Sequence, residues 1–178
     1  MNRITYALLA LLISVSVINC YAGKQYVSKD KLPCGEAEVT AETMCTNIPQ
    51  IATECTKQTI QLIDPSKDIS VRLPHEGKLV KKSVLKKKRA LDAFVTSWTC
   101  LKSNSGISYV LLWYTCSFGD ERPDCIGVGR EWERIFSLDG KDVTAGFRKQ
   151  DPRLPELYHR LGLSEVIDKG IHLKSVQY

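Results

Sequence analysis

The stretch from Phe94 to Val143 constrains the fold most strongly, because it is the part of the chain richest in aromatic and β-branched residues. Such residues fit the pleated, half-buried surface of a β-sheet. Runs of them separated by short clusters of turn formers are typical of antiparallel hairpins, and two such patterns follow one another here. The stretch therefore predicts a β-sheet core against which the rest of the chain packs.

The first hairpin pattern consists of two apolar runs, 94–101 and 107–117. With Asn104 and Ser105 as the two loop residues, Trp98 is expected to face Leu111. This register places five large side chains on one face, which is the expected core face: Phe94, Trp98, Tyr109, Leu111 and Trp113. The second run is apolar on both of its faces, which predicts a central strand covered on both sides.

The second hairpin pattern covers residues 128–143. Alternation places four apolar residues on one side of it: Val128, Trp132, Phe136 and Leu138. Glu131 and Glu133 point to the other side. The dipeptide Asp139-Gly140 is typical of a type I′ turn, in which both central residues have positive φ.

Residues 1–22 have the pattern of a secretory leader. Arg3 precedes an apolar run that ends near Ile18, and Ala22 supplies a small residue at the cleavage position. The run is too short to favour a membrane-spanning helix. Cleavage after Ala22 is expected to export the chain, most simply to a bacterial periplasm. An extracellular location and lipid attachment at Cys20 are the alternatives.

The chain has seven cysteines, of which six follow the leader: Cys34, Cys45, Cys55, Cys100, Cys116 and Cys125. An even number in an exported chain predicts three disulfides. The expected hairpin register places Cys100 on the core face and Cys116 on the opposite face, so these two are not expected to bond. Cys116 to Cys125 is the favoured bridge, and Cys100 is expected to reach back to one of the three earlier cysteines.

The remaining segments complete a single domain from Gly23 to Tyr178. An edge strand or loose arm is expected at 24–32, two or three short strands at 36–63, and further strands at 69–73 and 171–178. One helix is expected, with Asp151 as its N-cap, Pro152 at its first position and Gly162 at its end. The predicted fold class is mostly β or α+β: an antiparallel-sheet sandwich or open barrel with a short C-terminal helix, stapled by disulfides.

Seven basic residues with no acid among them lie between residues 78 and 89: Lys78, Lys81, Lys82, Lys86, Lys87, Lys88 and Arg89. The formal net charge of the whole chain is +5, so the rest of the chain is acidic on balance. One interpretation is a solvated face whose charges keep an edge strand from pairing. The functional interpretation is a docking site for an acidic protein partner. Nucleic acid is not expected, because no aromatic residue is interleaved with the lysines.

The loop that a Cys116–Cys125 bridge would close is the second candidate interface. Its candidate contact residues are Phe118, Asp120, Glu121 and Arg122. A disulfide would hold this loop in one shape and so lower the entropy cost of binding. The alternative is an ordinary exposed loop with Phe118 packed beneath it.

No catalytic residue, cofactor or metal ligand is assigned. The sequence contains no nucleophile elbow, zinc-protease motif or P-loop. Glu156 and His159 have a spacing that some metal sites use, but a single such pair predicts only local pairing on a helix. His75 and His172 are interpreted as surface residues.

The leader, the six cysteines and a β core with three tryptophans make the chain similar in broad type to small bacterial envelope proteins that bind and neutralise an enzyme, including lysozyme inhibitors and toxin immunity proteins. This similarity is architectural and transfers no residue-level motif. It implies a non-catalytic exported protein that occludes a protein partner. An envelope hydrolase whose carboxylates converge only in the fold is one alternative, and an envelope assembly or adhesion component is another.

Overall fold

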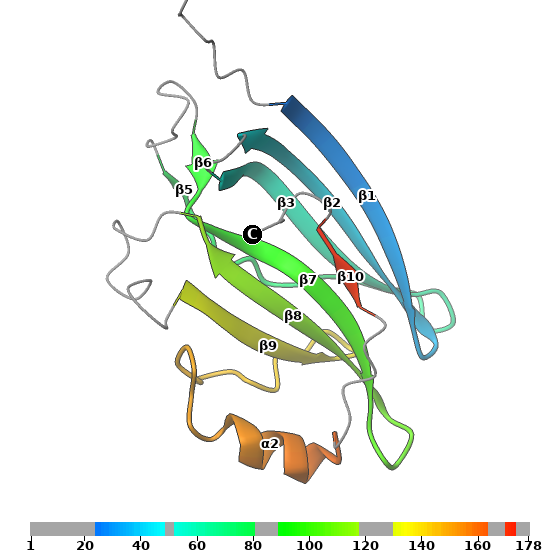
Figure 1. Cartoon of the computed structure of the whole chain (residues 1–178). Helices are drawn as coiled ribbons and strands as arrows, with labels where there is room; N and C mark the ends of the chain where they lie inside the picture. Colours follow the sequence, from blue (N-terminus) through cyan, green and yellow to red (C-terminus); the bar gives the residue numbers. More distant parts are fainter. Residues whose placement is uncertain (1–23, 49–51, 81–88, 118–129, 164–169, 174–178) are drawn as a thin grey trace, which may run out of the picture.

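The computed structural model describes residues 24–48, 52–80, 89–117, 130–163 and 170–173. These residues form two four-stranded antiparallel sheets, a two-stranded ribbon and a short helix (Figure 1). The strand orders are β1-β2-β3-β4 in the first sheet and β10-β7-β8-β9 in the second. The prediction of a disulfide-bonded, antiparallel, mainly β fold with one short helix is therefore confirmed.

The first sheet is a meander of β1 (Lys24–Cys34), β2 (Ala37–Ile48), β3 (Ala52–Asp64) and β4 (Ile69–Arg72). β1 is an edge strand, as predicted. The segment predicted as two or three short strands forms two long ones, β2 and β3. Alternate residues of β2 are buried without interruption from Ala37 to Cys45, so one continuous strand covers the core.

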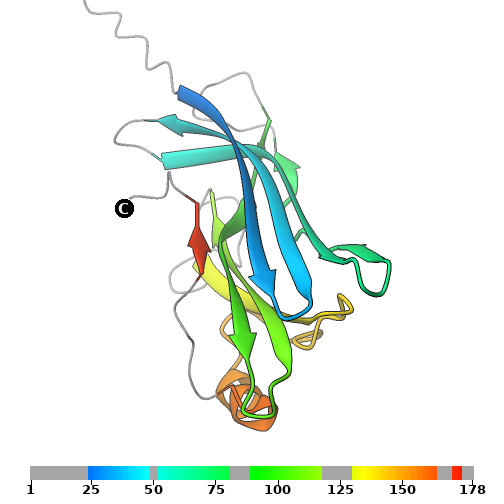
Figure 2. The same cartoon turned by 90° about the vertical axis from the view of Figure 1, so that its right-hand side faces the viewer.

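The second sheet contains β7 (Ala93–Lys102), β8 (Ser108–Cys116), β9 (Glu131–Ser137) and β10 (Ile171–His172). As predicted, β8 is a central strand. Its inner face joins the core between the sheets, where Trp98, Tyr114 and Phe136 are fully buried. Its outer face contributes to a second cluster beneath helix α2 (Leu154–Leu161), which includes Leu111 and Leu157. Figures 1 and 2 both show α2 against the second sheet, away from the first.

The predicted register between β7 and β8 was wrong by one residue along most of the hairpin. Lys102 pairs with Ser108 and Trp98 pairs with Leu112, so the turn contains five residues. Ser103 stabilises this longer turn, because its Oγ accepts a hydrogen bond from the backbone N of Ile107 at 3.0 Å. A shift of one residue moves every side chain to the other face of a strand. Trp113, expected in the core, therefore lies on the outer face.

One described disulfide joins the two sheets, and another lies within the first sheet. Cys34 on β1 is bonded to Cys100 on β7, which was one of the three expected partners, and Cys45 is bonded to Cys55 across β2 and β3. The altered register also places Cys116 in the inner core instead of on the opposite face. Cys116 is disulfide-bonded, and Cys125, its expected partner, lies outside the described residues.

The second hairpin turns through three residues instead of two. Ser137 N donates a hydrogen bond to Lys141 O, and Gly140 alone in this turn has positive φ, at 82°. The expected type I′ turn was therefore wrong, and the geometry is that of a three-residue loop with glycine in the left-handed conformation. Beyond the turn the chain makes a single bridge, from Asp142 to Phe136, in place of a full strand.

Helix α2 begins three residues after Asp151, with Arg153 in the N-cap position. The Asp151 carboxylate still satisfies a backbone donor at this end, because it accepts a hydrogen bond from Arg153 N at 3.0 Å. Gly162 ends the helix in the left-handed conformation, with φ of 67°, as predicted. Among the described residues, no helix has the length and apolar character needed to cross a membrane.

Candidate functional site

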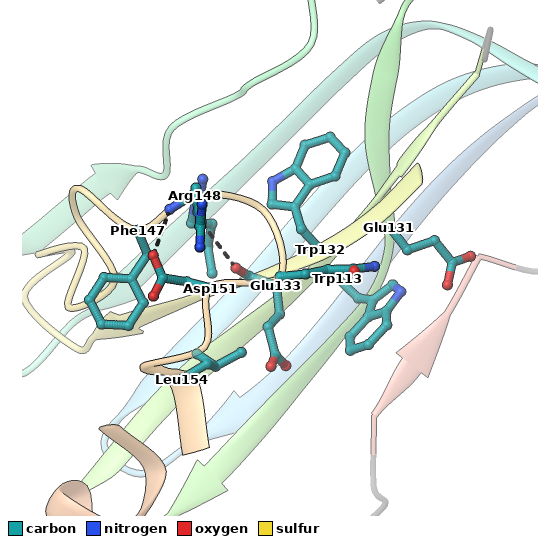
Figure 3. A pocket seen from close by; sticks show the side chains of 10 residues that line it. Trp113, Glu131, Trp132, Glu133, Phe147, Arg148, Asp151 and Leu154 are labelled. Carbon is teal, nitrogen blue, oxygen red and sulfur yellow. Dashed lines mark hydrogen bonds between the residues drawn. The ribbon is translucent and has the colours of Figure 1, made fainter. Parts of the chain in front are cut away.

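A cavity of about 330 Å³ opens on the outer face of the second sheet, beside α2 (Figure 3). Its walls come from β8, β9 and the segment that connects the second hairpin to α2. The lining residues are Trp113, Glu131, Trp132, Glu133, Arg134, Phe147, Arg148, Gln150, Asp151 and Leu154. The site therefore combines aromatic surface with charges of both signs.

Trp113 presents the largest aromatic surface at this cavity. Its side chain is 37% exposed, although it lies on the central strand of the sheet. Helix α2 covers the outer face at Leu111 but leaves Trp113 open. Trp113 is paired with Glu133 on β9, so the indole and the carboxylate belong to neighbouring positions on one face of the sheet.

Glu133 is half-buried, and its carboxylate extends between Leu154 and Trp113 (Figure 3). It accepts a hydrogen bond from the Tyr158 hydroxyl at 2.9 Å. Burial raises the pKa of the Glu133 carboxyl above its ordinary value, and the Tyr158 hydrogen bond opposes that rise in part. Among the described residues, no cationic side chain forms an ion pair with Glu133. The cavity thus contains a desolvated carboxylate whose side-chain partner is a neutral hydroxyl.

Asp151 has a structural role in the same wall. Its two carboxylate oxygens accept hydrogen bonds from the backbone N of Arg148 and of Arg153 and from the Arg153 guanidinium, at 2.8 to 3.1 Å. The Arg153 guanidinium holds the pKa of the Asp151 carboxyl well below its usual range. The same guanidinium lies over the Phe147 ring, 4.4 Å from its centroid. These contacts fix the segment that faces Trp113.

The buried side of the cavity is built around Trp132. Its ring stacks on Tyr114 with centroids 5.3 Å apart, and the ammonium of Lys149 lies over the Trp132 ring, 3.7 Å from the ring centroid. Trp132 Nε1 donates to Glu76 Oε2 at 2.9 Å, while Arg134 Nε donates to Glu76 Oε1 at 2.5 Å. These interactions hold Trp132 and Arg134, two residues that line the cavity, in one arrangement.

Most residues of the two predicted interfaces lie outside the described residues. These are Lys81, Lys82, Lys86, Lys87 and Lys88 of the basic run, and Phe118, Asp120, Glu121 and Arg122 of the loop. Lys78 and Arg89, at the ends of the run, are exposed. They lie next to the ribbon formed by β5 (Leu79–Val80) and β6 (Ala90–Leu91).

Sequence reasoning missed the cavity around Trp113. Trp113 was assigned to the core because of the one-residue error in register. The alternating pattern of β9 correctly predicted that Glu133 lies on the face opposite Trp132. This was the sequence signal that could have pointed to a polar site on the outer face. Glu156 and His159, the weak metal-ligand pair, are both exposed on α2. Among the described residues, no group of three His, Cys, Asp or Glu side chains is arranged to hold a metal ion.

Comparison with protein-family models, with curated proteins and with solved structures finds no match to this chain.

Proposed function

We propose that this protein is an exported, non-catalytic binding protein that occludes a protein partner, in the manner of an enzyme inhibitor or an immunity protein. The observation that carries the proposal is the exposed indole of Trp113 at the cavity on the second sheet. Tryptophan is enriched among the residues that dominate binding energy at protein interfaces. A solvent-exposed indole on a central strand, beside a preformed concavity, is suited to that use.

The rigidity of the site supports binding without large rearrangement. Asp151 fixes one wall, and Glu76 holds Trp132 and Arg134, which also line the cavity. The Cys34–Cys100 disulfide ties the second sheet to the first. A preorganised surface loses less conformational entropy when a partner docks.

Export is supported by the leader pattern and by the disulfides, which persist in oxidising compartments. The basic run from Lys78 to Arg89 would then act at longer range. Its charges would speed the approach of a partner with an acidic surface, because electrostatic steering raises association rates more than it tightens the final contact. The cavity would provide the contact and the basic run the attraction.

The experiment is affinity capture from envelope extract, with the oxidised chain from Gly23 to Tyr178 as bait and quantitative mass spectrometry of the retained proteins. Trp113→Ser is compared with Ile107→Ser, because Ile107 is also an exposed apolar residue, at 55% exposure, but lies in the hairpin turn. A protein retained in equal amounts by wild type and by Ile107→Ser, and lost with Trp113→Ser, is the expected result. If Trp113→Ser retains every captured protein in the same amount as wild type, the proposal fails.

A hydrolase is the second candidate, and Glu133 is the observation that favours it. A carboxyl with a raised pKa in a concave site is suited to donate a proton. Asp151, a second acid of the cavity, has both oxygens occupied by hydrogen bonds from its own segment. Release of soluble fragments from cell-wall polymer by the wild type, but not by Glu133→Gln, would support this candidate over the binding protein.

A further inference from the structure

We propose that the cavity binds a guanidinium group, supplied by an arginine side chain of the protein partner, between the Glu133 carboxylate and the Trp113 ring. The inference rests on the proposed function in one respect: the arginine is supplied by the protein partner proposed above. The affinity of the cavity for a guanidinium group is a separate property and is measured without any partner.

The charges around the cavity argue for a cationic ligand. Asp151 is neutralised by Arg153, and Arg134 is neutralised by Glu76. Glu133 contacts a hydroxyl instead of a cation, through one of its two oxygens. An opposite charge close to a half-buried carboxylate favours its ionised form. Its other oxygen, Oε1, forms no hydrogen bond with a described residue and is the expected acceptor.

The shape and aromatic character of the site select arginine among cations. Guanidinium is planar, is more weakly hydrated than ammonium and stacks on aromatic rings. The indole of Trp113 lies beside the Glu133 carboxylate with more than a third of its surface exposed. The protein already uses this interaction once at the same cavity, where the guanidinium of Arg153 lies over the Phe147 ring.

Arg148, which also lines this cavity, favours an anionic ligand instead of a cationic one. It is exposed, and its backbone N donates to Asp151. Its guanidinium makes no ion pair with a described residue, so an anion would be expected to bind there. Glu133 is the more buried of the two groups, and the gain from pairing a charge is larger where water is excluded. The test therefore includes an anionic probe.

The test uses the oxidised, full mature chain and follows the indole N–H resonance of Trp113 in two-dimensional NMR spectra. Three amino-acid probes are titrated: N-acetyl-arginine amide, N-acetyl-citrulline amide, which is its neutral isostere, and N-acetyl-aspartate amide. The expected result is a saturable shift with the arginine probe and at least tenfold weaker binding of citrulline. Equal binding of arginine and citrulline, or preferred binding of aspartate, would overturn the proposal.

Two variants complete the test. Glu133→Gln should weaken binding of the arginine probe at least tenfold, whereas Glu42→Gln, which removes the same charge from the exposed surface of β2, should leave it unchanged. Thermal unfolding of each variant shows whether it is folded. Unchanged affinity for the arginine probe in Glu133→Gln would contradict the inference.

The outcomes also distinguish the guanidinium site from the proposed function. If the probe does not bind but a protein captured by wild type is lost with Trp113→Ser, the guanidinium site is wrong and the proposed function stands. If the arginine probe binds but no captured protein depends on Trp113, the proposed function is wrong and the guanidinium site stands.

Discussion

Gln58 on β3 makes with Val95 on β7 the two hydrogen bonds that a neighbouring strand would make. Its Nε2 donates to Val95 O at 2.8 Å, and its Oε1 accepts from Val95 N at 2.7 Å. β10 pairs with β7 at Ser97 and Trp98, and does not extend to Val95 in the described chain. The Gln58 amide is buried and therefore connects the two sheets where strand pairing ends.

Replacing Gln58 with Leu should lower the free energy of unfolding by about 2 to 4 kcal/mol, because it leaves a buried backbone donor and a buried acceptor without partners. The control is Gln61→Leu, a half-exposed position on the same strand, where a change within about 0.5 kcal/mol is expected. Urea unfolding followed by tryptophan fluorescence measures both. Equal effects at the two positions would contradict the assigned role of Gln58.

Replacing Glu76 with Ala should destabilise the protein by about 1 to 3 kcal/mol. The change leaves Arg134, whose side chain is 12% exposed, without its carboxylate and removes the acceptor of Trp132 Nε1. Glu42→Ala is the matched control, because Glu42 pairs with Lys29 and Lys57 on the exposed surface, where ion pairs contribute about 0 to 1 kcal/mol. Thermal denaturation in low and high salt compares the two. A larger loss for the exposed pair would refute the prediction.

Glu133→Gln should stabilise the protein at pH 7 but not near pH 3. The folded state raises the pKa of this carboxyl above its unfolded value, so the folded state favours the protonated form, and that advantage is lost as the pH rises through the folded pKa. Glutamine keeps a neutral acceptor for Tyr158 at every pH. Chemical denaturation at the two pH values measures the difference. A variant less stable than wild type at pH 7 would show that the carboxylate is needed for folding.

The two described disulfides should contribute unequally to stability. Cys34–Cys100 spans 66 residues and Cys45–Cys55 spans 10. The loop-entropy relation gives about 4 kcal/mol for the longer closure and about 3 kcal/mol for the shorter. Paired Cys→Ala variants of each bridge, unfolded in guanidinium chloride without reductant, test the order. The reverse order would show that packing of the core between the sheets already holds the first sheet against the second.

The sequence predicts the features of this fold that depend on local pattern. The two-sided apolar character of 107–117 predicts a central strand, and β8 is one. Gly162 predicts the end of the helix because its conformation is intrinsic to glycine. The start of the helix was predicted wrongly: Asp151 is not the N-cap and Pro152 is not the first helical residue, because α2 begins at Leu154 with Arg153 as its N-cap.

What the sequence did not predict depends on contacts between distant residues or on a single turn. The register of β7 and β8 follows from the hydrogen bonds of Ser103 and Ile107, which add three residues to the turn. That error moved Trp113 from the surface into the core and hid the cavity. The environment of Glu133 depends on Tyr158 and Leu154, which reach it only after α2 has folded onto the sheet.

If the chain is exported N-terminus first, as we propose, the arrangement of the disulfides sets an order of events. Cys34, Cys45 and Cys55 all emerge before Cys100. During that interval, any bond made by Cys34 would be an incorrect one. Pairing of β2 with β3 places Cys45 opposite Cys55, and these two cysteines form a disulfide. Formation of this early hairpin would thereby leave Cys34 free to bond with Cys100 when β7 emerges.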